Sequence, residues 1–331
     1  MAEDIRNVNA VTQSYENKQV NKGLSPAPVP YVTGLELKAD ISINGLTLNT
    51  IDSNGVVWVC TDIEGWWNMP QPEFPDLPRG WGDGSYDIRG RWGARLLTLK
   101  GTFLTPDNSY VAAARAKLVE ALSLVYNGGW LKVNESPAKA AYVRLNGAPE
   151  ISTVNARGRT DFSIGLKAGD PIKYEWYTDP STPDPEGYRY TAQFGATSGG
   201  TTITINNTGN VKVPIRVYLT GTISPSGSNV YKLENTTRQI PMSDGTTRSE
   251  KLYIIGTLNG ASFEIDTYNK EILEITEDPA LPGVIDARNA RHKMDVTSDW
   301  IYLDPGINTL KWTGSSSNAK CQIGYRSGWI G

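Results

Sequence analysis

The chain has 331 residues, a formal net charge of −3, 33 glycines and 20 prolines, but only one histidine and two cysteines. This charge excludes a global basic field of the kind that attracts nucleic acid. No apolar run is long enough to span a membrane, and a single histidine excludes a zinc site built from several histidines. Short alternating runs rich in Val, Ile, Thr and Tyr predict a mainly β protein with two domains.

Residues 1–30 are polar, and we expect them to form an N-terminal arm. They have no basic start followed by an apolar core, so we expect no signal peptide. Cys60 and Cys321 lie far apart without metal-ligand spacing. This predicts two free thiols rather than a disulfide.

The first domain is expected over residues 31–178 and should be rich in β-strands. Asn44-Gly45 between alternating runs predicts a two-residue hairpin. The segment from Asp52 to Gly55 resembles part of a calcium loop, but the remaining ligands are missing, so we predict a plain turn. Further strands are expected at residues 130–134, 141–149 and 160–168.

An aromatic excursion organises the first domain. The stretch 57–103 begins and ends in strand-like runs and contains five of the ten tryptophans: Trp58, Trp66, Trp67, Trp81 and Trp92. Closely spaced prolines predict an extended, polyproline-like arm over residues 69–80. Residues 63–80 form the Trp/Pro-rich insertion.

This excursion needs an apolar surface to bury its tryptophans. They could pack on their own domain or on a neighbouring subunit, since tryptophan is enriched at interface centres. The residues alone leave both readings open. We therefore carry all five tryptophans forward as candidates for an inter-subunit interface.

One helix is predicted, over residues 106–126, with Thr105 as N-cap and Pro106 at its first position. Its apolar stripe consists of Val111, Leu118, Leu122 and Val125. A linker is expected over residues 179–190. From residue 191 to 331, short alternating strands predict a β-sandwich domain.

The search for catalytic chemistry yields little. His292 lies in a polar run without a G-x-S-x-G motif, and we expect it to be a surface histidine. No phosphate-binding loop occurs. A glycosidase could use the carboxylates of Glu264, Asp266 and Glu271. Carboxylates on a solvated strand face are commoner than a catalytic set. We predict no catalytic residue, cofactor or metal.

At this point the pattern resembles the distal tail (Dit) proteins of long non-contractile-tailed bacteriophages. In the first domain the likeness rests on the hairpin at Asn44-Gly45, then Gly82-Asp83-Gly84, Tyr86 and Gly90-Arg91, then the helix from Pro106. In the second it rests on Pro214 to Leu219, Phe263-Glu264-Ile265-Asp266-Thr267, Trp300, the turn Leu303-Asp304-Pro305-Gly306-Ile307-Asn308, Tyr325-Arg326 and Trp329. The long insertion at residues 63–80 departs from compact members and resembles minor tail proteins of actinobacterial phages.

The resemblance implies a β-rich ring-forming (belt) domain with one helix, followed by a galectin-like β-sandwich. It implies a structural virion protein, assembled in the host cytoplasm, that forms a homohexameric ring in the baseplate at the phage tail tip. The expected partners are the tail tube protein, the tail tip hub protein and the tape measure protein, and DNA passes through the central channel without specific binding. No membrane partner is implied.

Two other functions stay open. The second domain could bind host cell-wall sugar as a lectin-like attachment protein, with Trp300, Trp312 and Trp329 as candidate sugar-binding residues. A tail-associated cell-wall hydrolase is the weaker alternative. Fold alone does not decide between them.

Overall fold

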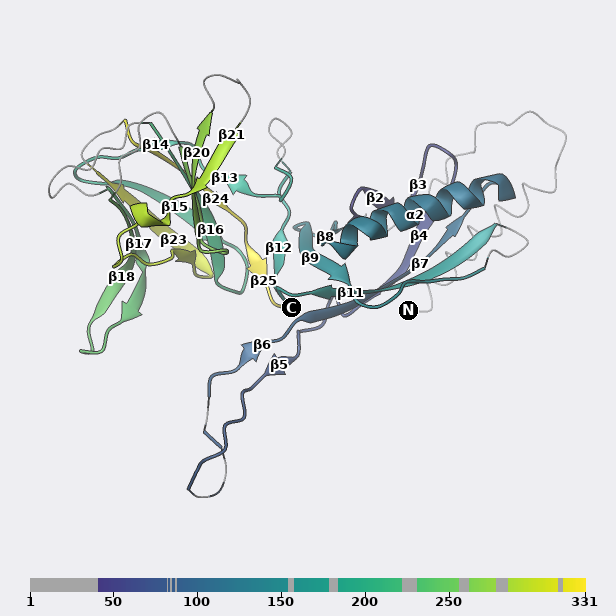
Figure 1. Ribbon diagram of the computed structural model, residues 1–331, viewed down its shortest axis with the longest axis horizontal. Helices are drawn as coiled ribbons and strands as arrows, with labels where there is room; N and C mark the ends of the chain where they lie inside the picture. Colours follow the sequence, from purple (N-terminus) through teal and green to yellow (C-terminus); the bar gives the residue numbers. More distant parts are fainter. Residues whose placement is uncertain are drawn as a thin grey trace. The chain divides into compact units, whose positions relative to one another are not determined.

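The computed structural model describes residues 41–81, 83, 85–86, 88–153, 158–178, 184–221, 231–255, 262–277, 285–314 and 318–331 (Figure 1). The predicted N-terminal arm, Gly82, Gly84 and residues 179–183 of the predicted linker lie outside these ranges. The chain divides into two compact units, Met1–Glu135 with Tyr142–Asp170, and Ser136–Ala141 with Pro171–Gly331. The prediction of a mainly β protein is confirmed, and the described residues contain one α-helix.

Antiparallel strands build the first unit. They are β1 (Ile41–Ile43), β2 (Leu46–Leu48), β3 (Thr50–Ile51), β4 (Val57–Glu64), β7 (Arg95–Leu104), β8 (Gly129–Val133), β10 (Glu150–Ile151), β11 (Arg159–Ala168) and the end of β9 (Lys139–Leu145). The main strand order is β2-β1-β8-β9-β11-β7-β4-β3, and β10 pairs with β11. In the central ladder, Arg159 of β11 faces Leu104 of β7, and Ala168 faces Arg95. Strand β4 joins the other side of β7 with an irregularity between Cys60 and Asp62.

The first two predicted turns are confirmed. Asn44 and Gly45 join β1 to β2 with φ angles of 44° and 84°. A type I′ hairpin turn requires positive φ at both of its central residues. In the next turn, Asp52 Oδ1 accepts hydrogen bonds from the backbone N–H groups of Asn54 (3.0 Å) and Val56 (3.1 Å). This carboxylate therefore closes a plain turn.

The helix region consists of a short 3₁₀ turn, η1 (Asn108–Tyr110), and α2 (Val111–Tyr126). The prediction that Thr105 is the N-cap was wrong. Thr105 is buried and its hydroxyl donates to the Gly158 carbonyl, whereas the Asp107 carboxylate accepts from the Ser109 N–H at 2.7 Å. Burial of the stripe is confirmed for Val111, Leu118 and Leu122; the side chain of Val125 lies outside the described part. Helix α2 runs across the sheet of this unit (Figure 1).

Two sheets form the second unit. One sheet has the order β13-β24-β16-β19-β20-β21, with β14 beside β24 and β22 beside β16. The other sheet has the order β15-β23-β17-β18. Outside these two sheets, β12 pairs with β25 and with the start of β9. Their bounds are β12 (Lys173–Glu175), β13 (Arg189–Tyr190), β14 (Phe194–Gly195), β15 (Thr201–Asn207), β16 (Val213–Thr220), β17 (Tyr231–Pro241), β18 (Thr247–Ile254), β19 (Ser262–Asp266), β20 (Glu271–Glu277), β21 (Ile285–Asn289), η2 (Arg291–Lys293), β22 (Tyr302–Leu303), β23 (Gly306–Thr313), β24 (Lys320–Tyr325) and β25 (Gly328–Trp329). Both sheets bury one face, with Val217 and Leu219 from the first and Leu233 and Leu310 from the second fully inaccessible. This is a sandwich core.

Two local features explain motifs in the sequence of this unit. Asn308 is buried, and its amide donates to the carbonyls of Asp304 (2.8 Å) and Gly306 (3.0 Å) while accepting from the Asp304 N–H. Gly306 has φ = 92°, so glycine suits this turn. The described end of the predicted linker, residues 184–190, is packed: Tyr188 is buried, and the Arg326 guanidinium lies 4.1 Å from its ring centroid.

Candidate functional site

A long ribbon leaves the sheet of the first unit between β4 and β7, and we call residues 67–94 the arm. Strand β5 (Pro72–Glu73) pairs with β6 (Arg91–Trp92) on the return path. Closer to the tip, Pro78 bridges Ser85, and the Tyr86 N–H donates to the Leu77 carbonyl at 2.9 Å. Figure 1 shows the arm projecting from β4 and β7 as an extended hairpin. The prolines thus allow an extended path with intermittent pairing.

A buried arginine holds the base of the arm. Arg95, at the start of β7, is 1 % exposed, and its Nη1 donates to the carbonyls of Gly65 (3.2 Å), Trp66 (3.3 Å) and Asn68 (2.5 Å). Burial lowers the pKa of the Arg95 guanidinium, but arginine stays charged in proteins. These bonds fix the direction in which the chain leaves the sheet.

The same turn requires glycine at position 65. Gly65 has φ = +83°, and a Cβ there would lie 2.2 Å from the Leu96 carbonyl oxygen. A side chain would therefore be both conformationally strained and in collision with backbone. The base of the arm is a fixed structure, and the sequence pattern alone did not indicate its two main residues, Arg95 and Gly65.

The five candidate interface tryptophans separate into two groups. Trp58 and Trp66 are fully buried; their indole N–H groups donate to Asp52 Oδ2 and Glu135 Oε1, each at 3.2 Å. These two pack on their own unit, so the structure corrects their assignment to an inter-subunit interface. Trp67, Trp81 and Trp92 are instead 66 %, 98 % and 42 % exposed.

The arm carries further exposed apolar side chains, Met69, Phe74, Leu77 and Tyr86. At about 200 Å² per aromatic side chain, its five exposed aromatics alone present on the order of 600 Å² to solvent. These side chains are spread along one segment, whereas exposed apolar residues on an ordinary monomer surface are scattered singly. The arm is therefore the strongest candidate for an interaction surface among the described residues.

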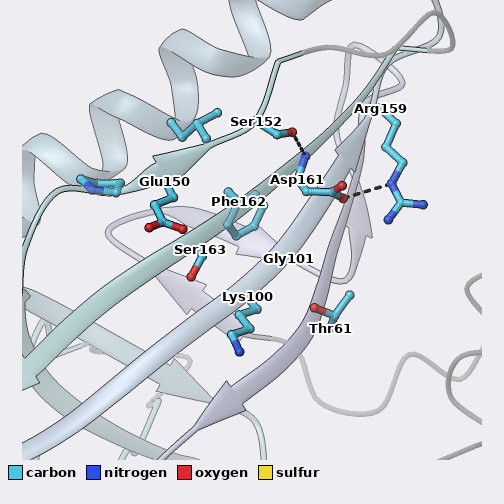
Figure 2. Close-up of a pocket in the computed structure, with 11 residues that line it drawn as sticks. Thr61, Lys100, Gly101, Glu150, Ser152, Arg159, Asp161, Phe162 and Ser163 are labelled. Atoms are coloured by element: carbon cyan, nitrogen blue, oxygen red, sulfur yellow. Dashed lines mark hydrogen bonds and ion pairs between the residues drawn. The ribbon is translucent and has the colours of Figure 1, made fainter.

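A second feature of the first unit is a pocket of about 790 Å³ over the half of the β7–β11 ladder that is farther from the arm. Glu150 of β10, Ser163 of β11 and Lys100 of β7 stand opposite one another in the strand register, as Figure 2 shows. The full lining is Thr61, Lys100, Gly101, Pro149, Glu150, Ile151, Ser152, Arg159, Asp161, Phe162 and Ser163. Phe162 lies against Gly101, where an added Cβ would be 2.3 Å from the ring.

Three polar residues of this pocket, Ser152, Arg159 and Asp161, are hydrogen-bonded to one another. Arg159 Nε donates to Asp161 Oδ1 at 3.0 Å, and the Asp161 N–H donates to Ser152 Oγ at 2.9 Å (Figure 2). The hydrogen bond that Lys100 donates to the Glu64 carboxylate raises the pKa of Lys100, whereas a lysine that acts as nucleophile or base needs a lowered pKa. The lining thus suits binding better than catalysis.

The other candidate residues do not converge on a site. Trp312 is fully buried and its indole N–H donates to the Ala319 carbonyl at 3.2 Å, which corrects its assignment as a sugar-binding residue. Lys139 Nζ lies 4.8 Å from the Trp329 ring centroid, and the Arg291 guanidinium lies 5.6 Å from that of Trp300. Cations therefore already contact both of these rings.

The carboxylates of β19 and the histidine have structural surroundings. Tyr218 donates to Glu264 at 3.1 Å, and Asp266 accepts from the N–H groups of Tyr268 and Asn269. His292 lies exposed in η2, as expected. Over the described ranges, no group of three His, Cys, Asp or Glu residues could hold a metal ion, and no helix there has the length and apolar character needed to cross a membrane.

No family model matches this chain, and no curated protein does so either. Among solved structures, this chain is similar in fold to a phage Dit protein. The SPP1 Dit (gp 19.1) protein, described as a paradigm of the hub adsorption apparatus in phages that infect Gram-positive bacteria, matches with a TM-score of 0.53 at 13 % identity over 88 % of this chain and 98 % of that one. A chain of the phage P2 baseplate in its activated conformation with Ca has a TM-score of 0.41, with 11 % identity over 88 % and 97 %. The Dit-like fold predicted from the sequence is confirmed.

Proposed function

We propose that this chain is a structural protein of a bacteriophage tail: a homohexameric distal tail adaptor between the tail tube protein and the tip hub protein, with a central channel for DNA. The observation that carries this proposal is the Dit fold over 88 % of the chain. The SPP1 protein of that fold is described as part of a hub adsorption apparatus, and we assign a related role to this chain. It would be built into the virion after synthesis in the host cytoplasm, beside the tape measure protein.

The arm supports the ring. A ring of identical subunits needs a head-to-tail interface that closes by rotation. From Met69 to Trp81 an extended strand covers about 40 Å. A compact unit of this size has a radius of gyration of about 15 Å, so the arm is about as long as a unit is wide. It is therefore long enough to lie across a neighbouring copy.

Three tryptophans of the arm, Trp67, Trp81 and Trp92, are the proposed contacts, because each already faces solvent in the single chain. Obligate interfaces bury roughly 2,000 Å² or more, and the exposed arm supplies a large apolar share. The net charge of −3 suits a channel that DNA passes without being gripped, because basic surfaces bind phosphates.

A shortened arm tests the proposal. The Gly93 N–H donates to the Gln71 carbonyl at 2.8 Å, so residues 72–92 can be replaced by an Asn-Gly turn that rejoins the two strands. We expect hexameric rings from the intact chain, by light scattering and negative-stain imaging, and monomers from the shortened chain. Met242→Ala, which removes an exposed apolar side chain of the second unit, should leave the rings intact. The proposal would be contradicted if the intact chain stays monomeric at its highest soluble concentration. It would also be contradicted if the intact and the shortened chain form oligomers with the same number of subunits.

A further inference from the structure

We propose that the pocket of the first unit receives the arm tip of a second copy of this chain, with Trp81 as the inserted side chain. This inference rests on the proposed function, because it assigns the receptor surface for the arm. Each copy would then offer one arm and one pocket, which is the arrangement that a head-to-tail ring requires.

Trp81 is the side chain that most needs a partner. It is 98 % exposed, and around the adjacent Gly80 an added Cβ would meet no atom within 4 Å. Two exposed charges flank it, Arg79 and Asp83. A fully exposed indole between opposite charges is a suitable anchor for a pocket that combines apolar contact with charges of both signs.

The pocket offers that combination. It is an open depression of about 790 Å³ on the surface of the sheet. Ile151 supplies apolar contact, since Phe162 is only 4 % exposed, and Glu150 supplies an acceptor for the indole N–H. Glu150 carries the charge that complements Arg79 of an incoming tip. Lys100 and Arg159 are already paired with Glu64 and Asp161, and they would share these exposed pairs with Asp83.

The arm of the same chain cannot fill this pocket. The arm leaves the ladder at Arg95, whereas the pocket lies around Lys100 and beyond, about 17 Å further along β7. Figure 1 shows the arm extending from the ladder in the direction away from β11. Because the tip lies about 40 Å from its base, the pocket and the tip that fit one another must belong to different copies.

Pocket-filling variants test the assignment with a control on the same strand. Ser163 lines the pocket, and Lys167 lies four residues further along β11, on the same face but outside the lining. We expect Ser163→Trp and Trp81→Ala each to weaken assembly by about 30-fold or more, measured as the concentration at half-assembly, and Lys167→Trp to change it less than twofold. Equal effects of Ser163→Trp and Lys167→Trp would overturn the assignment.

Cross-linking gives an independent readout. A disulfide requires Cα atoms about 4.4–6.8 Å apart. The cysteine on the arm is placed at Gly80, where an added Cβ meets no atom within 4 Å, so that Trp81 is kept. A chain carrying both Gly80→Cys and Ser163→Cys should form covalent oligomers on mild oxidation, and Gly80→Cys with Lys167→Cys should not. The two native thiols should contribute little to this cross-linking, because the thiolate is the reactive form. Burial raises the pKa of Cys60 to about 12 and also raises the pKa of Cys321.

The outcomes separate the two proposals. If the shortened arm abolishes rings but the pocket variants and the cysteine pair have no effect, the proposed function stands and the pocket assignment is wrong. If the shortened arm has no effect on mass, both are wrong. Ring loss in Ser163→Trp together with covalent oligomers from the cysteine pair would support both.

Discussion

The base and the tip of the arm are built from the same kinds of residue but have opposite surroundings. At the base, Trp66 is inaccessible and held by Glu135, and Arg95 binds three carbonyls. At the tip, Trp81 is 98 % exposed. A tryptophan-rich segment therefore serves two purposes here. The buried end fixes where the arm points, and the exposed end presents side chains that gain stability only when another surface covers them.

The largest difference should appear when a tryptophan is removed from each end. Trp66→Ala deletes a fully buried side chain and leaves the Glu135 carboxylate without the indole donor, so we expect a loss of about 3–5 kcal/mol in the free energy of unfolding. Trp81→Ala should change it by less than about 0.5 kcal/mol. Urea unfolding of the dilute chain measures both. Similar losses would show that the tip also packs on its own unit.

Two glycines provide the next comparison. Gly65→Ala places a Cβ against the Leu96 carbonyl at φ = +83°, and we expect it to destabilise the first unit by at least about 2 kcal/mol. Gly80→Ala, where the added Cβ meets nothing, should be neutral within about 0.5 kcal/mol. Thermal unfolding of the two variants checks this. A neutral Gly65→Ala would mean that the base of the arm can rearrange.

The smallest effect concerns pH. Burial alone would raise the pKa of Asp52, but hydrogen bonds from Trp58, Lys117 and backbone N–H groups outweigh it and lower the pKa below 3.8. A depressed carboxyl pKa stabilises the folded state above the unfolded pKa, and this contribution disappears as pH falls through the folded value. Asp52→Asn should therefore be less stable than the wild type at neutral pH, with the gap narrowing below pH 3.8. A gap independent of pH would contradict this account.

Local chemistry explains which features the sequence could predict. The turns at Asn44-Gly45 and at Asp52 depend only on residues within a few positions, so the sequence predicts both. The sequence predicts the helix but not its N-cap. The Thr105 hydroxyl hydrogen-bonds instead to the Gly158 carbonyl, 53 positions away. The pocket arises from the register of β10, β11 and β7, which no short motif encodes. Which tryptophans are buried likewise depends on distant partners such as Glu135.

The most direct test of the account is oxidative labelling of individual tryptophans, read by mass spectrometry, in dilute and in assembled protein. We predict that Trp66 is protected in both states, because it is buried within one copy. Trp81 should be labelled in the dilute chain and protected in the ring. Equal labelling of Trp81 in both states would contradict the central claim that its exposed surface is covered by a second copy.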